Sequence, residues 1–382
     1  MTEYSIFAEN FLIDGVWQNN LLVHIKSGRI ADISKTDSAH ADYRVCYLTP
    51  GLIDNHIHGG DGFSVVKPDA ASLIQWLERL AVNGVCGIML APYGSMDTIR
   101  AGLAVIREVM RLQQEGEISG ALLLGAHLEG PFISKKRPGA MTEDTILPSS
   151  IEKYTRMVSG YEDVIREITL APETDGAAEL IDHLTAQGIR VLAGHTDCGY
   201  EQAKQAFAAG VGAICHTFNA SIPIHHREPG IITAALTSPQ IYCEAICDLE
   251  HLHPGILRLI MSCKGKDRFM VISDAVSTTN LPDGLYTEGD VVVEVKNGVS
   301  RHRDLGCLNG GGCYLSKSVQ NLTAIGIPFE NAVAAASTTP ARWLGLDILP
   351  KAENAVFLEG WNEHYVPQYT FINGIICPCR HI

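Results

Sequence analysis

The sequence predicts an α/β fold: a (β/α)8 TIM-type barrel carrying a small β-sandwich domain built from both ends of the chain. In residues 51–345, short apolar runs typical of buried strands alternate with amphipathic runs typical of helices, the pattern of a parallel barrel. Residues 1–50 suggest short strands between Asp-Gly and Ser-Gly turns, and residues 346–382 return to that strand-and-turn pattern. A length of 382 residues suits one large barrel domain with an appendage.

Eight strands are expected in the barrel segment. They cover residues 51–58, 84–92, 121–131, 165–173, 190–197, 212–220, 241–248 and 268–275. Helical patterns separate most of them, for example residues 69–84 and 199–210. Because the catalytic side chains of such barrels come from the C-terminal ends of the strands, a functional site is expected at those ends.

The composition excludes several classes of function. Hydrophobic residues make up 46% of the chain and charged residues 19%, which indicates a globular protein with a large core. The formal net charge of −14 argues against binding to nucleic acid or to an anionic membrane surface. The chain has no long apolar run and no signal pattern at its acidic N-terminus, so no membrane-spanning helix is expected.

The 11 cysteines lie mostly in apolar, strand-like stretches. This placement predicts free thiols in a reducing cytoplasm rather than a disulfide framework. Cys377 and Cys379 form a CPC pair that could be a redox or metal pair, although a chance surface pair is the simpler interpretation.

Histidines and carboxylates gather at the predicted strand ends. Side chains two apart in a strand point to the same face. His56 and His58, at the end of the first predicted strand, have this spacing. A single histidine at a strand end is more often structural or solvated, but six such groups at one end of one barrel predict a metal site. Imidazole and carboxylate ligands suit Zn²⁺, Fe²⁺, Mn²⁺ or Co²⁺. The set is His56, His58, Glu129, His195, His216 and Asp274.

Motifs that carry a resemblance to a known family run through nearly the whole chain. They are PGLIDNHIHG, HLEGPF, LAPE, GHTD, HTFNA, HHREPGI, SDA and PDGLYTEG. With these motifs the chain resembles the amidohydrolase superfamily and, within it, the N-acetylglucosamine-6-phosphate deacetylases. The resemblance implies a metal-dependent hydrolase of amino-sugar catabolism. Its expected substrate is N-acetylglucosamine 6-phosphate or N-acetylgalactosamine 6-phosphate, and its products are the amino sugar phosphate and acetate.

The resemblance also implies roles for individual residues. Glu129, His195 and His216 match the main metal ligands of the family, and His56 and His58 match a second-metal pair that some members have. One or two divalent ions per subunit are therefore expected, with Zn²⁺ first among them. Asp274 matches the catalytic acid–base of the family. The positions that match substrate-binding residues are Ala140, Asn219, Ala220, Arg227, His251, Leu308, Asn309 and Gly310.

Arg227 matches an arginine that binds phosphate in the active site of the neighbouring subunit, so a homodimer is expected. A guanidinium fork suits the geometry of phosphate. Without the resemblance, a surface ion pair between Arg227 and Glu228 would be the simpler interpretation.

The sequence departs from the family pattern at two places. Met141 stands where the family usually has a histidine, and a thioether donates no strong hydrogen bond. The loop with Gly310–Gly312 has three glycines where the family has one. Two alternatives therefore stay open: an amidohydrolase of a different N-acylated substrate, and a catalytically weak paralogue that only binds a sugar phosphate.

Overall fold

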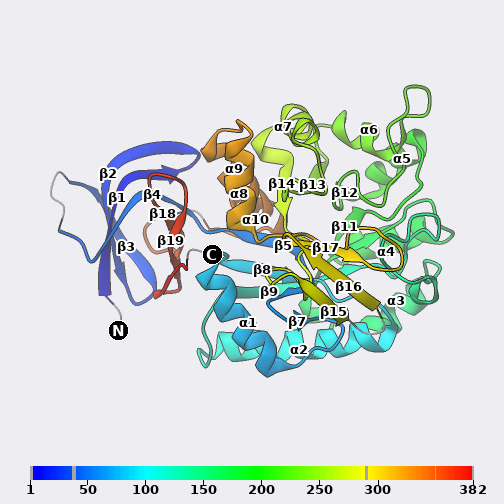
Figure 1. Ribbon diagram of the computed structural model, residues 1–382, viewed down its shortest axis with the longest axis horizontal. Helices are drawn as coiled ribbons and strands as arrows, with labels where there is room; N and C mark the ends of the chain where they lie inside the picture. The colour runs from blue at the N-terminus through cyan, green and yellow to red at the C-terminus, as the bar shows by residue number, and fades with distance from the viewer. Residues whose placement is uncertain (1–2, 37–39, 289–290, 349, 381–382) are drawn as a thin grey trace.

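The computed structural model consists of a small sheet-rich part that carries both chain ends and a larger barrel beside it (Figure 1). It describes residues 3–36, 40–288, 291–348 and 350–380. Within these ranges, no helix is long and apolar enough to cross a membrane.

The barrel consists of eight parallel strands that pair with one another in chain order. It closes between its first and last strands, because the Asp274 N–H donates to the His56 carbonyl over 3.0 Å and the His58 N–H donates to the Ala275 carbonyl over 2.8 Å. The predicted barrel is thereby confirmed. Its strands are β5 (Ile53–Ile57), β8 (Gly87–Leu90), β9 (Leu122–Glu129), β10 (Ile165–Leu170), β11 (Arg190–Ala193), β12 (Val211–Ile214), β13 (Tyr242–Ile246) and β14 (Phe269–Ile272).

Helices surround the barrel, and the two that were expected by range are present. The first begins after Asp69, whose side chain accepts a hydrogen bond from the Ser72 N–H and caps the helix. Its apolar face, with Leu73, Trp76 and Leu80, is buried at helical spacing. The helices are α1 (Ala70–Val82), α2 (Met96–Gln114), α3 (Ile151–Val158), α4 (Ala177–Ala186), α5 (Tyr200–Ala209), α6 (Gly230–Leu236), α7 (Pro254–Arg268), α8 (Leu315–Ala324), α9 (Phe329–Ala336) and α10 (Thr338–Leu344), with short 3₁₀ turns η1 (Glu143–Thr145) and η2 (Glu162–Val164).

A seven-stranded sheet forms the small β domain. It joins both ends of the chain, because β4 pairs with β18, with Pro50 opposite Leu358. Side chains from its strands, such as Ile6, Val23 and Phe371, form one buried cluster, so the sheet folds around its own core as a sandwich. The strands are β1 (Glu3–Ile13), β2 (Val16–Lys26), β3 (Arg29–Lys35), β4 (Tyr43–Pro50), β18 (Phe357–Trp361), β19 (Pro367–Ile372) and β20 (Ile375–Pro378).

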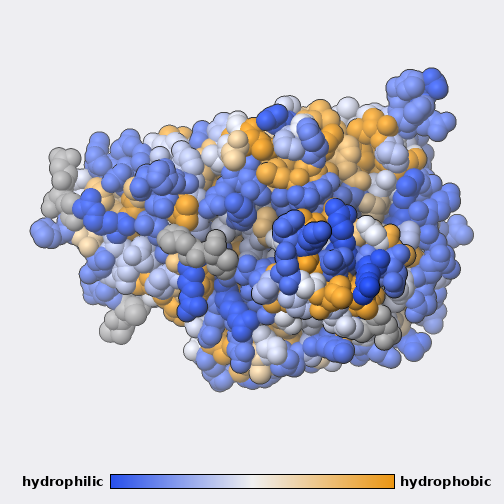
Figure 2. All heavy atoms as spheres, viewed as in Figure 1, coloured by the Kyte–Doolittle hydropathy of each residue, from blue (hydrophilic) through white to orange (hydrophobic). Residues whose placement is uncertain are grey.

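A three-stranded antiparallel sheet between β14 and α8 is an addition that the strand-and-helix alternation did not predict. It consists of β15 (Gly284–Glu288), β16 (Val291–Lys296) and β17 (Val299–His302), drawn in yellow in front of the barrel in Figure 1. Figure 2 shows apolar side chains among hydrophilic ones over this region. A second small hairpin, β6 (Gly59–Gly60) with β7 (Phe63–Ser64), follows the first barrel strand.

Candidate active site

A cavity of about 550 Å³ opens at the C-terminal ends of the barrel strands. The predicted site residues line it, except for His56, which is buried behind the surface, and Arg227. The three-stranded sheet contributes Glu288 and Val291 to one wall. The predicted residues in the lining are His58, Glu129, Ala140, His195, His216, Asn219, Ala220, His251, Asp274, Leu308, Asn309 and Gly310.

The backbone turns sharply at several of these residues. His195, His216 and Asp274 each lie two residues beyond the end of a barrel strand, and their φ angles are 47°, 24° and 51°. Residues other than glycine rarely adopt positive φ, which costs about 1–3 kcal/mol at each position. Backbone strain therefore occurs just beyond the C-terminal ends of these strands, where the three residues line the cavity.

The first group of possible metal ligands is Glu129, His195 and His216, all of them buried. Glu129 Oε1 lies 3.0 Å from His195 Nε2 and 2.9 Å from His216 Nε2. The two Nε2 atoms are 3.1 Å apart. One carboxylate oxygen and two imidazole nitrogens therefore converge on one point.

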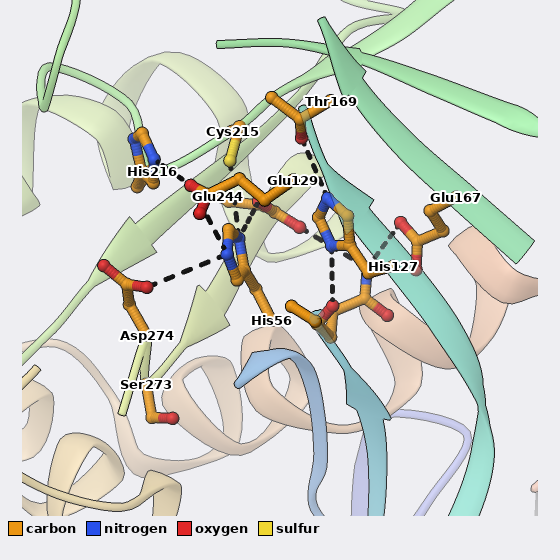
Figure 3. A network of polar contacts seen from close by, with 12 residues as sticks. His56, His127, Glu129, Glu167, Thr169, Cys215, His216, Glu244, Ser273 and Asp274 are labelled. Carbon is orange, nitrogen blue, oxygen red and sulfur yellow. Dashed lines mark hydrogen bonds and ion pairs between the residues drawn. The ribbon is translucent and has the colours of Figure 1, made fainter. Parts of the chain in front are cut away.

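The second group is His56, His58 and Asp274, and it adjoins the first. His58 Nε2 lies 3.1 Å from His56 Nε2 and 3.1 Å from Asp274 Oδ1. Glu129 lies between the two groups, because its other oxygen, Oε2, is 3.4 Å from His58 Nε2. Figure 3 shows Glu129 close to both His216 of the first group and His56 of the second.

Hydrogen bonds fix the orientation of two of these rings. His58 Nδ1 lies 2.6 Å from the Ala91 carbonyl, and His195 Nδ1 lies 3.0 Å from the Arg137 carbonyl. A carbonyl oxygen only accepts, so each Nδ1 carries the proton and each Nε2 presents a lone pair. Lone pairs that face one another at about 3 Å repel unless a cation lies among them. The donor set therefore fits a divalent metal ion.

Sequence reasoning missed a polar network in the barrel interior behind His56. His127 Nδ1 lies 3.0 Å from the Asn55 carbonyl, and His127 Nε2 lies 2.8 Å from the Thr169 hydroxyl. Burial lowers the pKa of His127 to about 4, so this ring is neutral. Although His127 groups with two glutamates as a possible metal site, both of its nitrogens have partners already. The spacing of His127 and Glu129, two apart like His56 and His58, was a signal for it.

Asp248 is a second residue that sequence reasoning missed. Its Oδ2 accepts a hydrogen bond from His251 Nδ1 over 2.8 Å and from the Gly312 N–H over 3.1 Å. Burial alone would raise the pKa of Asp248, but these hydrogen bonds and the charge of His251 hold it at about 2. Asp248 therefore fixes the ring of His251 and ties the glycine loop to the same wall of the cavity. The three-residue spacing of Asp248 and His251 was the available signal.

The glycine loop packs directly against the end of β14. A Cβ on Gly311 would lie 1.8 Å from the Ser273 carbonyl oxygen, and the Gly311 N–H donates to the Asp274 carbonyl over 2.7 Å. Gly310 has a φ of 68°, which favours glycine. Close approach to the residues after β14 thus explains Gly311, and the positive φ explains Gly310.

One thioether side chain and one aromatic side chain also line the cavity. Met141 lines the cavity, at the position where the family pattern has a histidine. Tyr93 also lines it, and its ring packs edge to face on His58 with centroids 5.0 Å apart.

Arg227 lies outside the cavity of its own chain, on an exposed loop before α6. Its Nη1 lies 2.6 Å from His226 Nε2. Within the described ranges no ion pair joins Arg227 to Glu228, the alternative that the sequence left open.

Comparison with known proteins shows what this chain is similar to. No protein-family model matches it. The N-acetylglucosamine-6-phosphate deacetylase of Vibrio furnissii is 35% identical over 346 residues, which are 89% of this chain and 85% of that protein. The N-acetylgalactosamine-6-phosphate deacetylase of Escherichia coli O157:H7 is 32% identical over 343 residues, 89% of each protein.

Solved structures agree with the sequence comparison. The N-acetyl-D-glucosamine-6-phosphate deacetylase of Mycobacterium smegmatis superposes with a TM-score of 0.90 at 26% identity, over 97% of this chain and 99% of that one. The N-acetylglucosamine-6-phosphate deacetylase of Thermotoga maritima superposes with a TM-score of 0.84 at 29% identity, over 97% and 98%.

Proposed function

Because this chain belongs to the N-acetylglucosamine-6-phosphate deacetylase family, we propose that it hydrolyses the amide of an N-acetylhexosamine 6-phosphate to the amino sugar phosphate and acetate. The gluco and galacto epimers are the two proposed substrates, since the relatives are named for both. The observation that carries the proposal is the convergence of two groups of possible metal ligands, with Asp274 in one of them, at the floor of the cavity.

We propose that Glu129, His195 and His216 hold a divalent ion, Zn²⁺ first among the candidates, and that His56 and His58 serve a second. Such an ion polarises the amide carbonyl and lowers the pKa of the attacking water toward neutrality. Elemental analysis of the purified protein should find between one and two ions per chain. A metal content near zero, with activity unaffected by chelators, would contradict this assignment.

The proposed proton carrier is Asp274. Its carboxylate takes a proton from the attacking water and later delivers it to the sugar nitrogen, which leaves poorly as an anion. Asp274 lies on the cavity surface while its Oδ1 remains 3.1 Å from His58 Nε2. It can therefore face both the substrate and the ligand cluster.

The rest of the cavity is proposed to hold the sugar phosphate. Asp248 holds His251 in place for this role. Arg227 is proposed to reach the phosphate in the cavity of a second subunit of a homodimer. Its exposure, together with that of Ile224 (45%) in the same loop, supports a contact between subunits. The other proposed substrate contacts are Ala140, Asn219, Ala220, Leu308, Asn309 and Gly310.

Two proposals concern the setting of the enzyme. The 11 cysteines are free thiols in the structure, which supports a location of the enzyme in a reducing cytoplasm.

We also propose that residues 51–345 form the catalytic domain, and that residues 1–50 and 346–382 form the two parts of the β domain.

Acetate release tests the proposed function. Metal-reconstituted protein is incubated with N-acetylglucosamine 6-phosphate, with N-acetylgalactosamine 6-phosphate and with the two sugars lacking phosphate. Acetate released from a phosphorylated sugar, and little from its unphosphorylated counterpart, is the expected result. Tight binding without acetate release would favour the sugar-phosphate-binding paralogue. Good turnover of the unphosphorylated sugar would favour an amidohydrolase of a different N-acylated substrate.

A further inference from the structure

A buried glutamate, Glu244, lies beside His56 (Figure 3), at ring nitrogen Nδ1, whereas Glu129 and His58 lie at Nε2. Glu244 comes from β13 and is 0% exposed. Its Oε2 lies 3.7 Å from His56 Nδ1, and among the described residues this oxygen has no hydrogen-bond partner. A buried carboxylate oxygen without a hydrogen-bond partner costs folding free energy. Its position beside an imidazole nitrogen therefore indicates a role for it there.

A chain of hydrogen bonds holds Glu244 from behind. The Asn55 amide group, Nδ2, donates to Glu244 Oε1 over 3.4 Å and to Glu167 Oε2 over 3.0 Å. Trp343 Nε1 donates to the same Glu167 oxygen over 2.6 Å. Burial and the charge of Glu244 raise the pKa of Glu167 to about 8, so Glu167 is protonated at neutral pH. Asn55 thus links the two glutamates, and Glu244 is the one of the pair that lies beside His56.

A thiol also lies beside His56 Nδ1. The Cys215 thiol, Sγ, lies 3.4 Å from that nitrogen. If the thiol donated its hydrogen, the ring proton would move to Nε2, the atom that faces Glu129 and His58. An acceptor oxygen beside Nδ1, such as Glu244 Oε2, favours the other tautomer, in which Nδ1 is protonated and Nε2 presents its lone pair.

We propose that Glu244 is a positioning residue for His56: it accepts the Nδ1 proton and so directs the Nε2 lone pair at the ligand cluster. Asn55 and Glu167 keep the carboxylate of Glu244 in place. Glu244 would thereby decide whether the His56–His58 pair takes up a second ion. This inference rests on the proposed metal-dependent function, and its test does not use activity.

The test is a titration of the metal-free, full-length protein with Zn²⁺ alone, against a chromophoric chelator that reports the number of ions and the affinity of each. The unaltered chain should bind two ions. Glu244→Gln should keep the first and bind the second about 10–100-fold more weakly, the usual effect of losing an outer partner of a ligand. A purely structural loss would weaken both ions together, so the selective loss is the signature.

Two matched variants serve as controls. Glu167→Gln alters an equally buried glutamate that does not adjoin His56, and the amide resembles the protonated acid already present there. Cys215→Ala removes the competing neighbour. Both should bind two ions as the unaltered chain does.

Several outcomes would overturn the inference. They are a second ion bound by Glu244→Gln with unchanged affinity, an equal loss in Glu167→Gln, and a single ion bound by the unaltered chain. The last result leaves acetate release, and hence the proposed function, standing. If Glu244→Gln does not fold, Glu244→Asp retracts the charge by one methylene. Glu244→Asp should also bind the second ion more weakly and keep the first, but with a smaller loss of affinity. If its affinity for the second ion were unchanged, the inference would be overturned as well.

Discussion

Asp274 differs from the histidines beside it in what its side chain can do. Backbone carbonyls orient His58 and His195, so no single side-chain substitution removes those partners. In the described part of the chain no backbone group holds the Asp274 carboxylate in this way: its Oδ1 approaches His58 Nε2 while the residue lines the cavity. A carboxylate in that place can exchange protons, and a substitution there should change chemistry more than architecture.

Asp274→Asn keeps the shape of the side chain but cannot accept a proton. We expect kcat to fall by about 10²–10⁴-fold, the usual range for general acid–base catalysis, with the ion at Glu129, His195 and His216 retained. Steady-state kinetics and elemental analysis on the same preparation measure the two quantities. Near-normal turnover would show that another group carries the proton.

Arg227→Ala tests the proposed contact with phosphate. Hydrogen bonds to ionised groups contribute about 1.5–3 kcal/mol each, so kcat/KM for the phosphorylated sugar should fall by roughly tenfold to a few hundredfold. The same sugar without phosphate is the control and should lose little further activity. His226→Ala is a matched variant on the same loop, since His226 contacts the guanidinium in the free chain. Equal losses on both sugars would mean that Arg227 supports the subunit contact and not the phosphate.

At the scale of elements, the glycine loop connects three parts of the site. It ends at α8 and touches β14 through Gly311, while the Gly312 N–H donates to Asp248, which orients His251. A displacement of this loop would therefore shift both the Asp274 backbone and the ring of His251, which belongs to the proposed sugar-phosphate site.

Gly311→Ala would place a Cβ 1.8 Å from the Ser273 carbonyl oxygen, so the backbone must shift. Overpacking of this kind costs about 1–3 kcal/mol, and we expect a lower unfolding temperature together with a lower kcat/KM. Gly199→Ala is the control, because no atom lies within 4 Å of its Cβ position and its φ is −73°. Equal unfolding temperatures for Gly311→Ala and the unaltered chain would contradict the close approach to β14.

The elements differ in how far the sequence could predict them. The barrel strands and the candidate metal ligands at their ends were predictable, because apolar runs and strand ends are local features of the chain. The three-stranded sheet was missed although residues 293–296 alternate between apolar and charged and an Asn-Gly turn, Asn297 with Gly298, follows them. Glu167 and Glu244 could not be assigned from sequence. Each is a single acidic residue in an apolar strand, and only the closed barrel brings them together.

At the scale of the whole molecule, the N-terminal and C-terminal segments of the β domain meet directly before β5, the strand that carries His56. The Gly51 N–H donates to the Phe357 carbonyl over 2.9 Å, and Thr370 donates to the Ala81 carbonyl over 2.9 Å. The sandwich therefore hydrogen-bonds to the chain directly before β5 and to helix α1. Glu359 of β18 lies in this junction, fully buried, and neither of its carboxyl oxygens has a hydrogen-bond partner in the described part of the chain.

Burial raises the pKa of Glu359 well above its ordinary value of 4.5, so the folded protein keeps this group protonated where the unfolded chain releases the proton. The stabilisation from the protonated group is complete below pH 4.5 and is lost as the pH rises above it, because the unfolded chain then binds fewer protons than the folded one. Glu359→Gln removes this dependence. Relative to the unaltered chain, the variant should gain unfolding temperature steadily from pH 5 to pH 8. Exposed Glu117→Gln is the control and should show a pH-independent difference. A Glu359→Gln difference that also stays constant would mean that Glu359 is ionised in the folded protein, and that the junction holds a charge rather than a neutral acid.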